Sequence, residues 1–201
     1  MPEKLSERIS ELQSNLIAVN PQQLAMCTGA EVDQGTRNLN LVFLDRQISC
    51  GFPELIFFDK ETSIVLPDSI QALLLYYLTT ADGTPLSGRW ISFASLPDGR
   101  FYNKAFQGYS GDELAKYFGN DLDSFECAGI RLKGVKIAYG DRAFAFHILP
   151  RFMISIIFHL GDEDFPSSCQ ILFDESSHHY LPTDACAVVG SMITKKMVKS
   201  N

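Results

Sequence analysis

The stretch AFAFHILPRFMISIIFHLGDEDFPSSCQILF, residues 143–173, decides the fold class. It contains three apolar runs rich in β-branched and aromatic residues, at 143–148, 152–160 and 168–173. Pro150-Arg151 separates the first two runs, and the glycine, acidic and proline residues of 161–166 separate the last two. Connections this short join antiparallel neighbours, because a parallel crossover needs a dozen or more residues. The stretch therefore predicts an antiparallel meander.

Further strands are expected outside this meander. Residues 39–45 and 46–50 form two apolar runs that meet at a tight polar turn, which is typical of a β-hairpin. Shorter strands are expected at residues 55–58, 63–66 and 135–139.

Helical segments flank and interrupt the strands. Residues 3–19 carry apolar side chains at three- and four-residue steps, and residues 70–80 are apolar on most sides. Two more helices are expected at 110–118, where Ser-Gly-Asp-Glu has the spacing of a capping box, and at 183–197, after a Thr-Asp cap. The fold class is therefore α+β: one antiparallel β-sheet of hairpins and a meander, with helices packed mainly on one face.

Composition narrows the class of protein. The chain has 201 residues and a formal charge of −7, which argues against a polybasic binder of nucleic acid or lipid head groups. The first eight residues lack the apolar core of a signal peptide, and no stretch has the length and apolarity of a membrane span. We expect a cytoplasmic protein with neither nucleic-acid nor membrane partners. A single domain over 1–201 is expected, with an N-terminal helix and connector (1–36) and an α+β core (37–201).

The five cysteines are Cys27, Cys50, Cys127, Cys169 and Cys186, and none lies in a Cys-x-x-Cys pair. A zinc or iron–sulfur site usually uses such close pairs, so neither is indicated. We expect these residues to act as small buried hydrophobic side chains. Cys169 stands beside the acidic segment 162–164, whose negative charge is expected to raise its pKa and lower its reactivity.

A first polar cluster surrounds the last turn of the meander. Asp162, Asp164 and His159 supply the carboxylate and imidazole ligands that a divalent cation requires, with Glu163 between the two acids. The alternative is a solvated hairpin tip, because adjacent acidic residues in a turn are ordinarily exposed to water. The metal site and the solvated tip both stay open.

A second cluster follows the last strand. Asp174, His178, His179 and Tyr180 are the candidate catalytic residues, because loops after strands often carry functional side chains. If the segment coils as a helix, Asp174 lies one turn from His178 and orients its imidazole as a general base requires. The alternative is that the two histidines cap strand carbonyls or lie exposed.

The candidate cofactor-binding residues form an aromatic–basic patch of Arg89, Trp90, Tyr102, Gln107 and Tyr109. Aromatic faces beside cationic side chains suit a planar anionic ligand or an acidic partner, although core packing is the alternative. The chain contains neither a phosphate-binding Gly-x-x-x-x-Gly-Lys loop, nor a dinucleotide fingerprint, nor a Gly-x-Ser-x-Gly nucleophile motif. The identity of any cofactor stays open.

Several motifs resemble a family of uncharacterised prokaryotic proteins, frequent in anaerobes and known as a domain of unknown function. The resemblance spans roughly residues 68–195. It rests on the segments 75–78 (LYYL), 88–93 (GRWISF), 101–106 (FYNKAF), 161–166 (GDEDFP), 172–174 (LFD) and 179–183 (HYLPT). Some longer relatives carry an added iron–sulfur module, which implies redox or metallocofactor metabolism for the family. This chain lacks the cysteine pairs of such a module.

Two functions from different classes follow. The first is a binding protein that holds a small ligand or cofactor, or docks onto a redox protein partner through the aromatic–basic patch and the acidic turn. The alternative is an enzyme in which Asp174 orients His178 or His179 for proton transfer, with a divalent cation at Asp162 and Asp164. A structural assembly subunit, recognisable by an exposed apolar surface, is a third hypothesis.

Overall fold

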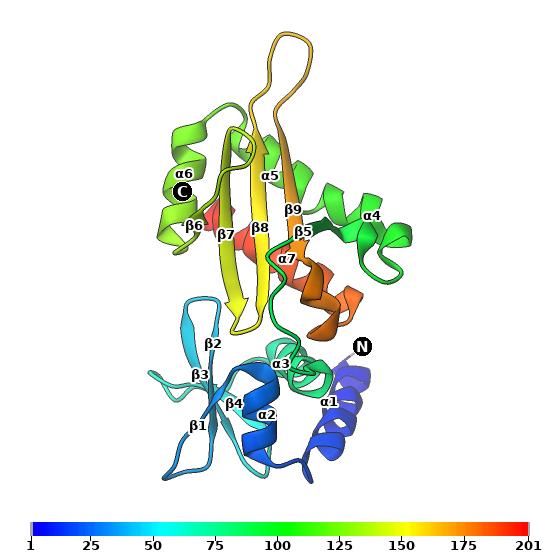
Figure 1. Ribbon diagram of the computed structural model, residues 1–201, viewed down its shortest axis with the longest axis vertical. Coiled ribbons are helices and arrows are strands. Elements are labelled where there is room, and N and C mark those ends of the chain that lie inside the picture. The colour runs from blue at the N-terminus through cyan, green and yellow to red at the C-terminus, as the bar shows by residue number, and fades with distance from the viewer. Residues whose placement is uncertain (1, 201) are drawn as a thin grey trace. The chain divides into compact units, whose positions relative to one another are not determined.

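A computed structural model describes the backbone of residues 2–200 and the side chains of residues 4–200. The chain forms two compact units (Figure 1). The first unit comprises Met1–Pro85, Leu149–Arg151 and His179–Pro182, and the second comprises Leu86–Ile148, Phe152–His178 and Thr183–Asn201. Compact units within one chain can unfold together or separately, so the single domain stays a prediction.

The first unit contains three helices and a four-stranded sheet within its described residues. They are α1 (Pro2–Leu16), α2 (Pro21–Thr28), β1 (Glu31–Val32), β2 (Leu39–Phe43), β3 (Arg46–Gly51), β4 (Ile56–Asp59) and α3 (Asp68–Thr80). The sheet has the strand order β1-β2-β3-β4, and each pair is antiparallel. The β2–β3 hairpin, which pairs Phe43 with Arg46 across its turn, confirms the hairpin predicted from the sequence.

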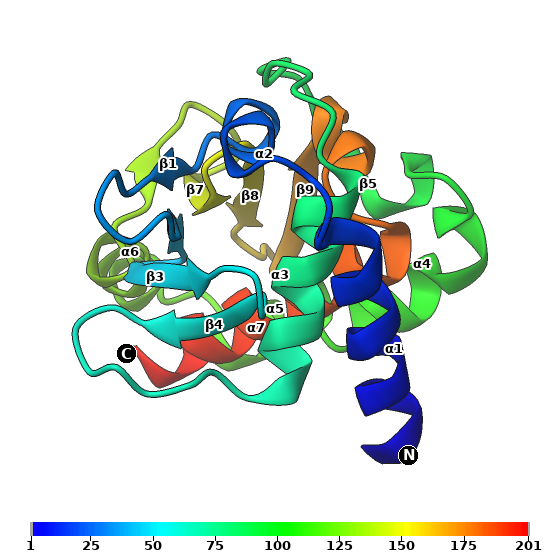
Figure 2. The same ribbon diagram turned by 90° about the horizontal axis from the view of Figure 1, so that it is seen from below.

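Helix α3 forms the centre of the first unit, because most of its side chains are buried. Helix α1 packs along α3, as Figure 2 shows. The sequence predicted one helix over 3–19, whereas α1 ends at Leu16 and α2 begins at Pro21. The Asn20 side chain accepts a hydrogen bond from the Gln22 amide, and Pro21 stands where a helix tolerates proline, so the break is a cap followed by a new helix.

The second unit contains, among its described residues, a five-stranded sheet, helices α4–α7 and two short 3₁₀ segments. The strands are β5 (Trp90–Ser92), β6 (Val135–Lys136), β7 (Arg142–Leu149), β8 (Phe152–His159) and β9 (Ser168–Asp174). The helical segments are η1 (Phe93–Ser95), α4 (Gly99–Gly108), α5 (Gly111–Phe118), α6 (Leu122–Arg131), η2 (Glu175–His179) and α7 (Thr183–Lys199). The strand order is β5-β9-β8-β7-β6.

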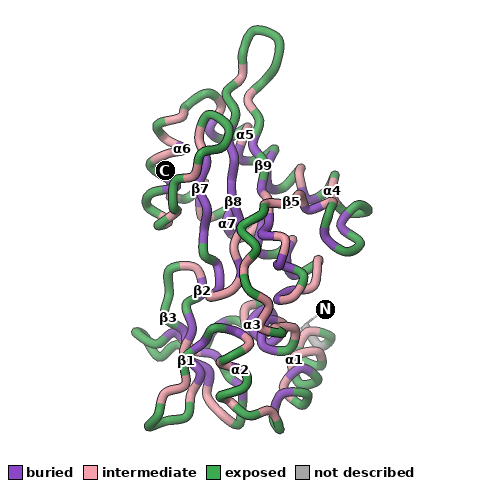
Figure 3. The backbone as a smooth tube through the Cα atoms, in the orientation of Figure 1, coloured by how far each residue is buried: buried purple, intermediate pink, exposed green. Residues whose placement is uncertain are grey.

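Helices cover one face of this sheet, and Figure 1 shows α5 and α7 behind it. Cross-strand partners share a face, so Ile154 with Phe173 and Phe158 with Cys169 belong to the helix side. Phe158 packs against Phe125 of α6, with ring centroids 4.8 Å apart, which fixes that assignment. The strands β7–β9 are buried along most of their length (Figure 3). The α+β class with helices on one face of the meander is therefore confirmed.

Several details of the fold differ from the sequence prediction. The described residues form two sheets where one was expected. Residues 63–66 contribute only an isolated bridge, between Val65 and Phe58, and the strand expected at 135–139 is reduced to β6. The helices α2, α4 and α6 were not predicted. Asp121 caps α6 by accepting from the Ser124 amide, a local signal that the sequence does carry.

The start of α5 agrees with the sequence, but its cap does not. Ser110 holds the cap position without making a side-chain hydrogen bond to the helix start. Its buried hydroxyl instead donates to the Phe106 carbonyl oxygen at 2.5 Å. The capping-box spacing therefore predicted the position of the helix correctly, but the expected cap does not form. The Ser110 hydroxyl donates to the preceding helix α4 and not to the start of α5.

The cysteine prediction is confirmed for Cys50, Cys169 and Cys186, which are buried, but Cys27 is only half-buried and Cys127 is exposed. Desolvation by burial, and not the acidic turn, is the main cause of the raised pKa of the Cys169 thiol. No helix among the described residues is long and apolar enough to cross a membrane.

Two glycines of α4 provide a matched test of packing. A Cβ at Gly99 would overlap the Phe93 carbonyl oxygen, whereas a Cβ at Gly108 meets nothing within 4 Å. We expect Gly99→Ala to lower the free energy of unfolding by about 1–3 kcal/mol, because η1 must move away. Gly108→Ala should leave it unchanged or raise it by up to about 1 kcal/mol. Urea denaturation measures both, and equal effects would contradict the close approach of η1 and α4.

Candidate functional site

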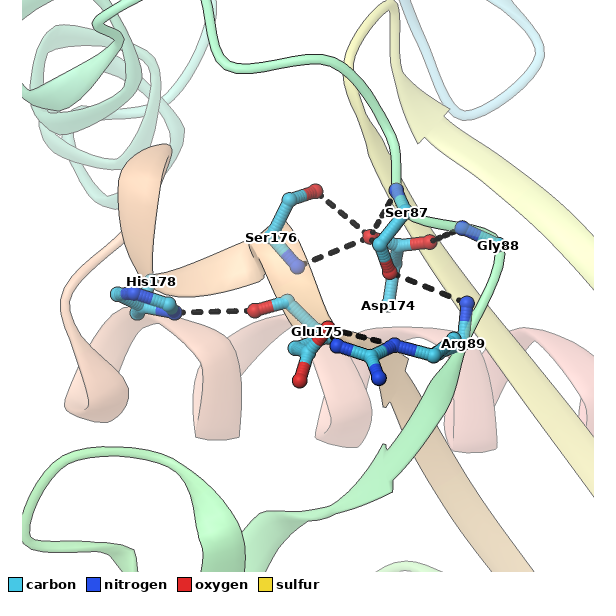
Figure 4. A network of polar contacts seen from close by, with 7 residues as sticks. All are labelled: Ser87, Gly88, Arg89, Asp174, Glu175, Ser176 and His178. Atoms are coloured by element: carbon cyan, nitrogen blue, oxygen red, sulfur yellow. Dashed lines mark hydrogen bonds and ion pairs between the residues drawn. The ribbon is translucent and has the colours of Figure 1, made fainter.

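A buried carboxylate organises the end of β9. Asp174 is 1% exposed, and its Oδ1 accepts hydrogen bonds from the amide and hydroxyl of Ser87 (3.0 and 3.1 Å) and of Ser176 (2.9 and 2.7 Å). Its Oδ2 accepts from the Gly88 amide at 2.8 Å (Figure 4). We call this arrangement the Asp174 clamp. It ties the segment before β5 to the start of η2.

The clamp explains the ionisation state of Asp174. Burial alone raises the pKa of this carboxyl, but the hydrogen bonds from Ser176, Ser87 and Gly88 outweigh it, so the pKa lies below its ordinary value. Four hydrogen bonds to Oδ1 and one to Oδ2 stabilise the ionised carboxylate, so Asp174 is a weaker base than an ordinary aspartate. The geometry gives Asp174 a structural role and lends no support to the catalytic role predicted for it.

The predicted pairing of Asp174 with His178 is not what the structure shows. Residues 175–179 do coil, as the 3₁₀ segment η2. However, the hydrogen-bond partners of the Asp174 carboxylate are Ser87, Gly88 and Ser176, and the His178 Nδ1 lies 3.0 Å from the Glu175 carbonyl oxygen (Figure 4). His178 thus contacts the backbone of its own helical turn and is exposed.

The aromatic–basic patch is spread over two elements. Arg89 forms an ion pair with Glu175, and Trp90 lies half-buried on β5. Tyr102, Gln107 and Tyr109 belong to α4 and the residue after it, with Tyr102 70% exposed. The Arg89 guanidinium is therefore already engaged by a carboxylate. A cofactor site formed by these five residues stays a prediction.

The acidic turn between β8 and β9 is an ordered, exposed loop. The Oδ1 of Asp162 accepts hydrogen bonds from the amides of Asp164 and Phe165, at 2.9 and 2.8 Å. His159 and residues 162–166 are exposed. Over residues 4–200, no group of three His, Cys, Asp or Glu side chains lies where it could hold a metal ion. The metal site of Asp162, Asp164 and His159 therefore stays a prediction without geometric support.

His179, the other predicted histidine, contacts the carboxylate of Asp82, and both residues belong to the first unit. His179 Nδ1 lies 2.6 Å from Asp82 Oδ2 and 3.2 Å from the Thr84 hydroxyl. Hydrogen bonds from the Thr84 hydroxyl and amide, and from His179, lower the pKa of Asp82 to about 2. Asp82 is therefore ionised at neutral pH and can only accept, so Nδ1 carries the hydrogen of this contact. The imidazole is 34% exposed.

Two further side chains of the first unit contact the same loop, residues 82–84. The Tyr180 hydroxyl donates to the Thr84 carbonyl oxygen, and its ring lies 5.8 Å from that of Tyr77. Arg151 Nη1 donates to the Gly83 carbonyl oxygen at 2.7 Å, and the Arg151 amide donates to the Tyr77 hydroxyl at 3.0 Å. The loop thus gathers His179, Tyr180 and Arg151, which we call the loop 82–84 site.

Burial raises the pKa of the Tyr180 phenol, and the guanidinium of Arg151, within hydrogen-bonding reach of the phenol, offsets part of that rise. Tyr180 is fully buried and remains a protonated donor at neutral pH. Its hydroxyl holds the Thr84 carbonyl oxygen, and Thr84 in turn contacts the His179 imidazole.

Sequence reasoning identified His179 and Tyr180 but missed Asp82, Thr84 and Arg151. Asp82 stands 97 positions before His179, and its Asp-Gly-Thr-Pro surroundings are typical of a surface turn. Arg151 lies in the short turn between β7 and β8. Neither has a local pattern that distinguishes it from ordinary turn residues. Only the tertiary structure could identify them.

Most of the chain matches a known family. A family model with the description Domain of unknown function (DUF3786) matches residues 20–196. This range is wider than the 68–195 over which the motifs suggested a resemblance. The anaerobic prokaryotic origin and the iron–sulfur module of longer relatives stay expectations. Comparison with curated proteins and with solved structures gave no match.

The Asp174 clamp predicts a stability cost for a neutral isostere. Asp174→Asn places an amide group against the Gly88 amide or the serine donors, so we expect the free energy of unfolding to fall by about 1–3 kcal/mol at pH 7. Because the pKa of Asp174 is lowered in the folded protein, its stabilisation is present above the ordinary carboxyl pKa and is lost as pH falls through the lower folded value. Urea denaturation should show the gap between the two proteins narrowing in acid.

The matched control is Asp98→Asn. Asp98 is exposed, precedes α4 with a left-handed backbone that asparagine also tolerates, and makes no side-chain cap. It should change the free energy of unfolding by less than about 0.5 kcal/mol. If Asp174→Asn behaved like this control, the clamp would not be the interaction that stabilises the end of β9.

Proposed function

The chain belongs to the family described as Domain of unknown function (DUF3786), and from its own geometry we propose that it transfers a proton to or from a small molecule at the loop 82–84 site. His179 is the acid–base group and Asp82 orients it. An enzyme with an Asp–His pair was the alternative hypothesis raised by the sequence. Here Asp82 takes the orienting role that was expected of Asp174.

One observation carries the proposal: the 2.6 Å contact between His179 Nδ1 and an ionised Asp82. A carboxylate that accepts from Nδ1–H sets the tautomer of the neutral ring, so Nε2 is the nitrogen that exchanges a proton. A positioned imidazole of this kind is the commonest general acid or base, and it contributes typically 10²- to 10⁴-fold to a rate. The partial exposure of His179 allows a small molecule to approach.

Hydrogen–deuterium exchange tests the activity on a panel of candidate substrates. In D₂O, we expect the protein to accelerate exchange of carbon-bound hydrogens next to the carbonyl group of at least one compound in a panel of small oxo acids and sugar phosphates. His179→Gln should reduce that acceleration by about 10²-fold or more. Asp82→Asn should reduce it less, because the imidazole remains but loses its preferred tautomer. Mass spectrometry of the panel measures the exchange.

Histidine ¹⁵N NMR provides the control for this experiment. At alkaline pH, where imidazoles are neutral, His179 should be in the Nδ1–H tautomer, and Asp82→Asn should shift it toward the Nε2–H form. The exposed His147 serves as reference and should not respond. An Nε2–H tautomer for His179 in the unaltered protein would contradict the proposal, whatever the result of the hydrogen–deuterium exchange experiment.

A second candidate function, docking to an acidic protein partner, is favoured by one surface. On α4, Phe101 is 86% exposed and Tyr102 is 70% exposed, with exposed Arg100 and Lys104 beside them. Exposed aromatic rings between cationic groups are common in protein interfaces. In a chain of net charge −7, this locally basic surface suits an acidic segment of another protein.

An acidic peptide containing phenylalanine tests the docking surface by NMR titration. We expect chemical-shift changes concentrated on α4, weakened by salt because exposed charges are screened. Lys104→Glu should weaken binding by about threefold or more, as expected for loss of one exposed charge pair and gain of a repulsion. Lys195→Glu, on the exposed surface of α7, is the control for net charge. Equal weakening by both substitutions would contradict a specific surface on α4.

A further inference from the structure

Arg151 is a half-buried arginine that makes no ion pair with a described carboxylate. Its guanidinium donates to the Gly83 carbonyl oxygen at 2.7 Å and lies close enough to Tyr180 to lower the pKa of that phenol. A guanidinium has five N–H donors, and these contacts occupy at most two of them. The positively charged Arg151 guanidinium therefore keeps N–H donors that can bind the oxygen atoms of a ligand.

The position of this charge is constrained from several sides. The Arg151 amide is held by the Tyr77 hydroxyl, which itself donates to the Thr28 carbonyl oxygen at 2.6 Å. The arginine side chain also lies over Gly29, where an added Cβ would approach its Cγ at 3.3 Å. Backbone, phenol and side-chain contacts thus restrict the guanidinium to the loop 82–84 site.

The same loop connects the guanidinium to the imidazole. Gly83 accepts from Arg151, and its two neighbours, Asp82 and Thr84, contact His179. Withdrawing a cation from water is costly unless an anion or several hydrogen-bond acceptors replace the hydration. Asp82 does not serve as that anion, since it pairs with His179 and makes no ion pair with Arg151.

We propose that Arg151 binds the anionic oxygens of a carboxylate or phosphate group on the small molecule whose proton His179 exchanges. The inference rests on the proposed function and adds the class of substrate. The planar guanidinium matches two oxygens of either group in a bidentate contact, which fixes the ligand's orientation as well as its position. Arg151 is thus a substrate-binding residue, and His179 is the acid–base group beside it.

NMR titrations with inorganic phosphate and with acetate test this site, each at constant ionic strength set by chloride. We expect saturable shifts of the Arg151 Nε–H and the His179 side chain, with a Kd on the order of 1 mM. The better of the two anions identifies the ligand group. Arg151→Gln should raise that Kd about tenfold or more, the size expected from losing a charge-assisted hydrogen bond. The exposed Arg37→Gln, in the same unit, should leave it unchanged.

The titration of the unaltered protein decides the question even if Arg151→Gln fails to fold. Shifts that map elsewhere, or neither anion binding more tightly than chloride, overturn the inference. If phosphate or acetate binds equally well to folded Arg151→Gln, the inference is also overturned.

A failure of the proposed function is distinguished by His179→Gln. That variant should retain the phosphate or acetate shifts at Arg151 within about threefold of the original Kd, because the guanidinium supplies the charge. Anion binding with no proton exchange therefore leaves Arg151 as an anion site and removes only the acid–base role. Proton exchange without anion binding at Arg151 removes the anion site and leaves the acid–base role of His179.

Discussion

The buried carboxylate of Asp174 is the interaction on which the order of the second unit's sheet edge depends. It accepts five hydrogen bonds from Ser87, Gly88 and Ser176, which come from segments about ninety positions apart. The clamp holds β5 beside β9 and begins the η2 turn directly after the strand. A charged group can be buried here because each donor replaces part of its lost hydration.

The two aspartates near the histidine pair differ in environment, and their roles differ accordingly. Asp174 is buried and accepts five hydrogen bonds from neighbouring segments, so it stabilises structure. Asp82 is half-exposed in a turn and presents one oxygen to His179, so it can orient an imidazole that remains partly accessible. Proximity in the sequence favours Asp174 as the partner of the histidines. The hydrogen bonds of Asp174 come from Ser87, Gly88 and Ser176, and the turn at Asp82, in the same unit as His179, provides the carboxylate that contacts this imidazole.

The parts of the fold that were predictable are those with strong local patterns. The runs that became β7, β8 and β9 are separated by short turns, and short turns permit only antiparallel neighbours. The sequence did not predict α4, which begins at Gly99 directly after a turn and carries the exposed aromatic residues Phe101 and Tyr102. It also could not show that the hairpin of β2 and β3 belongs to a separate sheet, because sheet membership depends on pairing between distant segments.

The amino-acid sequence by itself determined the α+β class, the antiparallel meander and the presence of His179 and Tyr180 in a polar segment after its last strand. These follow from hydrophobic periodicity and turn chemistry, which act over a few residues. Only the tertiary structure decided which carboxylate meets which imidazole, and that Arg151 joins them at the loop 82–84 site. The reason is physical: hydrogen bonds and charge contacts between side chains depend on distances of about 3 Å in space, and separation along the chain carries no information about them.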